Sequence, residues 1–147
     1  MEIDIIELSI EVEVDFNAIR NALSLVLGLP EDQIGDQHSE YFLAEGINPA
    51  LTLGLRVRHY QDNRFITYVD TFSQEICTEW DVLELAYFLS QKYECLVLLG
   101  RYFFAGDLMV IDEKGRIYDA FQGMEDPDMI VGTELLGTYQ DLIKNAP

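Results

Sequence analysis

The side chains of this sequence that could carry chemistry are 27 carboxylates, two cysteines and two histidines. Cys77, Cys95, His38 and His59 lack the short ligand spacing of a structural zinc site. We therefore predict no metal site and no cofactor. The sequence contains no phosphate-binding loop, dinucleotide fingerprint or nucleophile elbow, so we also predict no catalytic residue.

The carboxylates give the protein a large negative net charge. Against nine Lys and Arg residues they give a formal net charge of −18, and residues 1–50 hold 11 acids and one base. Such a surface repels nucleic acid and anionic lipid, and it attracts basic proteins over a Debye length of about 8 Å. We therefore expect a basic protein partner, with no direct nucleic-acid contact and no membrane contact. The plain alternative is that the acids serve solubility alone.

Several features favour a cytoplasmic location. The N-terminus, MEIDIIELSIEVEVD, lacks the basic region and the unbroken apolar stretch of a signal peptide. The longest apolar runs, such as 96–99, are too short to cross a membrane. A continuous helix between Cys77 and Cys95 would hold them roughly 27 Å apart, whereas a disulfide needs Cα atoms within about 7 Å. We therefore expect free thiols, which are typical of the cytoplasm.

The elements that position these charges follow from hydrophobic periodicity. Alternation from Ile6 to Val14 predicts a strand with one apolar face and one carboxylate face. Asp15 is typical of the N-cap of a helix that ends at Gly28. The alternating residues 51–60, followed by a turn and residues 64–69, predict a hairpin.

The second half of the chain continues this pattern. Thr78 and Asp81 form a capping-box-like start for a second helix, and residues 96–99 have the pattern of a buried strand. Residues 108–111 and 116–118 predict a second hairpin, and residues 134–145 predict a last, short helix. We therefore predict an α+β fold in a single domain, residues 1–147. Its mostly antiparallel sheet would have about five to six strands and pack against two main helices.

Residues 30–50 are turn-rich and acidic, and we interpret them as a long connection with one short strand near residues 41–44. Long connections in compact domains are often functional, so this segment is a candidate surface. Its aromatic residues, Tyr41 and Phe42, have two interpretations. They are either core residues or the anchors of an interface whose carboxylates steer a partner.

The stretch LVLLGRYFFAGDLMVIDEKGRIYDAF, residues 96–121, resembles the strand–turn–strand segment of SUKH-type bacterial immunity proteins. In that segment an aliphatic strand and a glycine precede a small residue, an apolar strand, an Asp, a Gly and an aromatic strand. More broadly, the chain is similar to small acidic immunity proteins that neutralise bacterial toxins. The resemblance implies a cytoplasmic domain that occludes a basic, often nuclease, active site.

Three hypotheses follow. In the first, the chain is an immunity protein whose carboxylates bind the cationic cleft of a cognate toxin. Its candidate contacts lie in turns and at a helix start: Glu40, Glu45, Asp62, Glu75, Glu79, Asp81, Glu125, Asp126 and Asp128. The second is an acidic nucleic-acid mimic or adaptor, which predicts carboxylates spaced like phosphates along one face, beginning with Glu7, Glu11 and Glu13. The third is an enzyme with an unrecognised site, which predicts a deep polar pocket around an acid of perturbed pKa.

Overall fold

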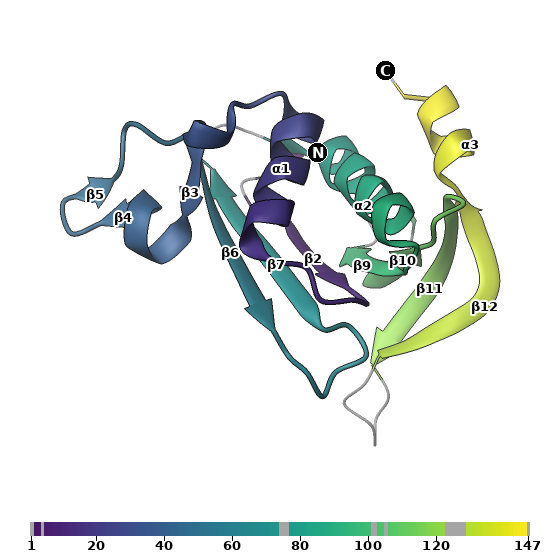
Figure 1. The fold of residues 1–147 in the computed structure, drawn as a ribbon. Coiled ribbons are helices and arrows are strands. Elements are labelled where there is room, and N and C mark those ends of the chain that lie inside the picture. Colours follow the sequence, from purple (N-terminus) through teal and green to yellow (C-terminus); the bar gives the residue numbers. More distant parts are fainter. Residues whose placement is uncertain are drawn as a thin grey trace.

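A computed structural model of the chain describes residues 2–3, 5–73, 77–100, 103–104, 106–122 and 129–146. Helices α1 (Phe16–Leu27) and α2 (Glu79–Tyr93) lie side by side on one face of a large sheet (Figure 1). The strand order of this sheet is β12-β11-β10-β9-β2-β7-β6-β3. Neighbouring strands are antiparallel except β3 and β6, which are parallel, so the sheet is mixed.

The strands of this sheet vary from three to ten residues in length. In chain order they are β2 (Glu7–Ile10), β3 (Ile34–Asp36), β6 (Leu53–His59), β7 (Thr67–Ser73), β9 (Val97–Gly100), β10 (Leu108–Ile111), β11 (Arg116–Gln122) and β12 (Met129–Thr138). Two pairs of two-residue strands lie outside the sheet: β1 (Glu2–Ile3) with β8 (Cys77–Thr78), and β4 (Phe42–Leu43) with β5 (Gly46–Ile47). The remaining helical segments are short, namely η1 (Glu31–Gln33), the π turn η2 (Gln37–Tyr41) and α3 (Tyr139–Lys144).

The α+β class holds, but the predicted sheet of five to six strands is wrong. The described residues form an eight-stranded mixed sheet, and three short helical segments accompany the two long helices. Strand β3 has only three residues and lies inside a turn-rich stretch, so it has no visible alternation. Register shifts between Ile117 and Ala120 interrupt the ladder of β11 with β12. The last helix was predicted from Glu134, yet the chain remains in β12 as far as Thr138.

Local capping signals located the two long helices correctly. The carboxylate of Asp15 accepts a hydrogen bond from the N–H of Ala18 at 2.8 Å, and α1 ends at Gly28, whose φ is +69°. The carboxylate of Asp81 accepts a hydrogen bond from the N–H of Thr78 at 2.9 Å, where α2 begins. These contacts satisfy amides that have no partner within the helix.

Two buried threonines of β7 hold the segments on either side of β2. The hydroxyl of Thr67 accepts a hydrogen bond from the N–H of Val14 at 2.9 Å and donates one to the carbonyl of Val12 at 2.8 Å. The hydroxyl of Thr71 accepts one from the N–H of Ile6 at 3.2 Å. These bonds satisfy backbone groups that leave the ladder, because β2 ends at Ile10 and not at Val14 as predicted.

The opposite face of the sheet, called the outer face here, carries charged and apolar side chains. Arg56 of β6 lies opposite Asp70 of β7, and Asp70 lies opposite Glu7 of β2. Farther along this face, a second apolar cluster consists of Phe65, Leu98, Val110 and Ala120. In the described part of the chain α1 and α2 cover only the inner face (Figure 1). No helix among the described residues is long and apolar enough to span a membrane.

The first prediction concerns Thr67. Thr67→Val keeps the shape of the side chain but leaves the buried amide of Val14 without its acceptor. We expect the free energy of unfolding to fall by about 2 kcal/mol, the usual cost of an unsatisfied buried polar group. Urea denaturation measures this loss. The control is Thr133→Val at an exposed position of β12, which should change stability by less than about 0.5 kcal/mol. Equal losses in both variants would contradict the role of Thr67.

Candidate functional site

Residues 31–50 form a lobe that projects from the β3 edge of the sheet (Figure 1), and we call this segment the acidic lobe. It has no Lys or Arg; the nearest ones in the sequence are Arg20 and Arg56. Its five acids are Glu31, Asp32, Asp36, Glu40 and Glu45. The lobe therefore combines negative charge, without a Lys or Arg of its own, with a position at the edge of the sheet.

The ring of Tyr41 fastens the lobe to the outer face. Tyr41 is fully buried, and its ring lies on the backbone of Gly54 in β6. A Cβ atom at residue 54 would lie only 2.7 Å from Cγ of Tyr41, so the contact requires a glycine. The Tyr41 ring also packs at 6.0 Å between centroids against Phe72 of β7. Tyr41 is thus a core residue and not an interface anchor, so the first of the two interpretations is confirmed for Tyr41.

Hydrogen bonds within the lobe fix its π turn. The carboxylate of Asp36 accepts bonds from the N–H of His38 at 3.0 Å and from the N–H and hydroxyl of Ser39, both at 2.9 Å. Burial alone would raise the pKa of Asp36, but these hydrogen bonds outweigh burial and leave the pKa below its ordinary value. The ionised carboxylate therefore stabilises the turn. This contribution is lost as the pH falls through the lowered pKa.

Glu40 closes the turn from the other side. Its carboxylate accepts a hydrogen bond from the N–H of Asp36 at 2.9 Å, and its carbonyl accepts one from the side chain of Asn48 at 3.0 Å. The N–H of Asn48 in turn donates to the carbonyl of Tyr41 at 2.8 Å. The lobe is therefore a braced structure, although its sequence has the composition of a loop.

The braced turn presents two large apolar side chains to solvent. Phe42 is 40% exposed and Leu43 is 41% exposed, and both belong to β4. The Phe42 ring packs edge-on against the Tyr41 ring, with 5.0 Å between centroids. It also packs against the tilted ring of Phe72, with 5.3 Å between centroids. Exposed aromatic residues on a rigid base, with charged residues around them, are typical of interface anchors.

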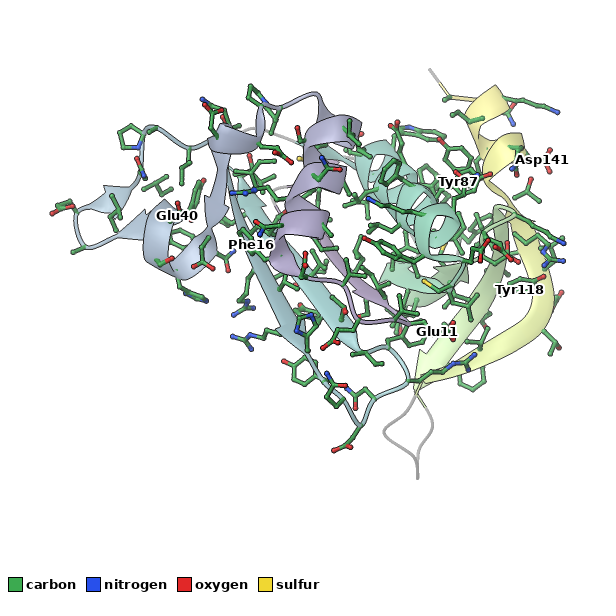
Figure 2. All side chains as sticks on the ribbon, viewed as in Figure 1. Glu11, Phe16, Glu40, Tyr87, Tyr118 and Asp141 are labelled. Atoms are coloured by element: carbon green, nitrogen blue, oxygen red, sulfur yellow. The ribbon has the colours of Figure 1, made fainter. Side chains whose placement is uncertain are left out.

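Of the predicted contact residues that the structure describes, two lie on the acidic lobe. Glu40 and Glu45 are exposed on the acidic lobe, and Figure 2 shows Glu40 at its π turn. Asp62 lies in the turn after β6, at the far end of a seven-residue strand that spans about 20 Å. Glu79 and Asp81 lie in the first turn of α2, where Asp81 is engaged in capping. The others lie outside the described residues: Glu75, Glu125, Asp126 and Asp128.

Asp36 and Leu43 belong to this site but were not predicted from the sequence. A usable signal was present, because no Lys or Arg occurs from residue 21 to residue 55. A stretch of that length with acids and no Lys or Arg predicts a negatively charged surface. The bracing role of Asp36 had no comparable signal, since it depends on how the turn folds.

The cysteine thiols, which could be reactive groups, lie outside the lobe. Cys77 and Cys95 are both buried, and no disulfide joins them. Burial, and then the negative charge of Glu11, raise the pKa of Cys95 to about 11, so its thiol stays protonated at neutral pH. Across the described ranges, no group of three or more His, Cys, Asp or Glu side chains is placed to hold a metal ion.

Comparisons of the chain with protein-family models, with curated proteins and with solved structures gave no match. The resemblance of residues 96–121 to SUKH-type immunity proteins therefore remains an expectation. In the structure this stretch contains β9 and β10, which pair antiparallel, and most of β11, which pairs antiparallel with β10.

The second prediction concerns the contact of Tyr41 with Gly54. Gly54→Ala places a Cβ atom against the buried ring, and we expect a loss of roughly 1–3 kcal/mol in the free energy of unfolding, as for overpacking. We also expect faster chymotrypsin cleavage at Phe42 and Leu43, because the lobe separates more readily from the sheet. In a Tyr41→Gly background these contacts are absent, because the Cβ of Tyr41 would itself lie only 2.9 Å from the added Cβ, so the alanine should add no further loss. The same added loss in both backgrounds would contradict this contact.

Proposed function

We propose that this chain is an immunity-type inhibitor that binds a positively charged bacterial toxin domain and covers its active site with the acidic lobe. The observation that carries the proposal is the exposure of Phe42 and Leu43 on a braced segment that has five acids and no Lys or Arg. The resemblance of residues 96–121 to SUKH-type immunity proteins supports the same class of function.

The two components of the lobe have different physical roles. Unpaired negative charge accelerates encounter with a basic partner and makes the association rate depend on salt. The apolar pair supplies binding energy that persists once water is excluded, because fully desolvated aromatic residues dominate the energetics of interfaces. A cationic active-site cleft with an apolar rim would complement both components.

The nucleic-acid-mimic hypothesis receives less support from the geometry. It requires a regular row of carboxylates, beginning with Glu7, Glu11 and Glu13. Because β2 ends at Ile10, these three residues do not share one strand. Glu11 is engaged by Arg64 and by the amide of Leu96, and Glu13 accepts a hydrogen bond from Gln61. We therefore favour a folded protein partner.

The third prediction tests the lobe as an interface. The probe is a catalytically inactivated, basic nuclease-toxin domain, taken from the gene next to that of this chain where that gene encodes one. Phe42→Ala should weaken its binding by roughly 30-fold, the effect of losing about 2 kcal/mol at an interface anchor. Glu40→Gln with Glu45→Gln should slow association several-fold at about 50 mM salt and much less at about 500 mM. Surface plasmon resonance across a salt series measures both effects.

The matched control is Glu84→Gln with Asp141→Asn, which removes the same charge from exposed positions on α2 and α3. Figure 2 shows Asp141 at the opposite end of the molecule from Glu40. This control should bind like the unaltered protein. Inhibition is then measured with the active toxin domain. Full nuclease activity in the presence of saturating protein, or equal losses of binding in control and lobe variants, would overturn the proposal.

A further inference from the structure

A groove of about 340 Å³ lies on the outer face, between β7, β2, β9 and β10. Strand register places Ser9 of β2 opposite Leu98 of β9, and Gly100 of β9 opposite Leu108 of β10. The groove is lined by these residues, by Tyr68, and by the carboxylate-bearing Glu7 and Asp107. Gly100 contributes no side chain, so space remains beside Glu7. The groove therefore combines an apolar wall with two carboxylates.

Within the described residues, the carboxylate of Glu7 has a like charge beside it and no ion pair. Glu7 lies directly opposite Asp70 on the neighbouring strand, and like charges in such a pair destabilise a sheet. Arg56 forms an ion pair with Asp70, whose side chain is only 9% exposed. Among the described residues, none of the ion pairs involves Glu7. In the part of the sheet that the structure describes, the carboxylate of Asp70 thus has a cationic partner, and that of Glu7 lines the groove without one.

The pKa of Tyr68 shows the effect of the negative charges at this position. Burial, followed by the charges of Glu7 and Asp70, raises the pKa of its hydroxyl above the ordinary value. A cation that entered the groove would gain from both carboxylates and from the face of the aromatic ring.

We propose that this groove receives the side chain of a Lys or Arg residue of the bound protein. The aliphatic stem lies along Leu98 and Leu108, and the cationic group lies between the carboxylates of Glu7 and Asp107. Lys and Arg match this lining because their stems are apolar and their ends are charged. The inference rests on the proposed function in that the donor of the side chain is the basic partner.

The groove and the acidic lobe belong to one face. Phe72, which packs against Phe42 of the lobe, is two residues from Asp70 on β7, and Asp70 is the cross-strand neighbour of Glu7. A single partner can therefore place an apolar contact on Phe42 and a basic side chain in the groove.

The test, our fourth prediction, uses two amino-acid probes with the same four-carbon stem, Nα-acetyl-lysine amide and Nα-acetyl-norleucine amide, which lacks the ammonium group. Each is titrated into the full chain while the methyl resonances of Leu98 and Leu108 are recorded. We expect saturable shifts with the lysine probe and none with the norleucine probe over the same range. In Glu7→Gln with Asp107→Asn, the affinity for the lysine probe should fall at least about tenfold, equivalent to about 1.4 kcal/mol.

The control Glu84→Gln with Asp141→Asn should bind the lysine probe like the unaltered chain. The urea midpoint of the Glu7→Gln and Asp107→Asn variant should be unchanged or higher, because the like-charge pair with Asp70 is relieved. Equal shifts with both probes, or unaltered lysine binding in the groove variant, would overturn the inference. The probes test the groove by itself, whereas toxin binding by the lobe variants tests the proposed function, so the two failures are distinguishable.

Discussion

The acidic lobe depends on one contact, the buried ring of Tyr41 lying on Gly54 of β6. The lobe also joins the sheet through the packing of Tyr41 and Phe42 against Phe72 and through the three-residue parallel pairing of β3 with β6. Gln33 of the lobe accepts hydrogen bonds from the N–H and the hydroxyl of Thr52. Burying an aromatic ring contributes on the order of 2 kcal/mol, which is enough to hold a short segment in place. The glycine is essential because any Cβ atom there would occupy the position of the ring. The same contact leaves Phe42, the next residue, on the surface. The attachment of the lobe and the exposure of Phe42 therefore have the same cause.

The two faces of the sheet have different roles. The inner face is closed by α1 and α2 over a core that includes Leu8, Ile10 and Leu99. The outer face carries the row Arg56, Asp70 and Glu7, with the lobe at one side of it and apolar side chains at the other. Only Asp70 in this row has a cationic partner in the described structure. A surface that leaves a carboxylate unneutralised beside apolar side chains sacrifices some stability, and binding of a basic side chain would recover it.

Sequence patterns predicted those parts of the fold that have local causes. Asp15, Gly28, Thr78 and Asp81 marked helix ends correctly because capping involves residues close in sequence. Strand β3 and the full length of β12 were missed, since a three-residue strand and a bulged ladder have no regular alternation. For the candidate site, composition pointed to residues 30–50 and to Glu40 and Glu45. It did not separate buried Tyr41 from exposed Phe42, because that difference arises from a glycine in a strand that follows later in the chain. Asp62 and Asp81 are equivalent to Glu40 by composition, yet the fold places them in a distant turn and in a helix cap.

The central claim is that a basic protein binds the outer face through the acidic lobe, and hydrogen exchange of the amides tests it most directly. The chain is compared alone and with the inactivated toxin domain, with exchange followed residue by residue. We expect slower exchange at residues 42–48 of the lobe and along β7 and β2, with α3 unchanged. Slower exchange confined to α2, α3 or β12, with the lobe unaffected, would contradict the account.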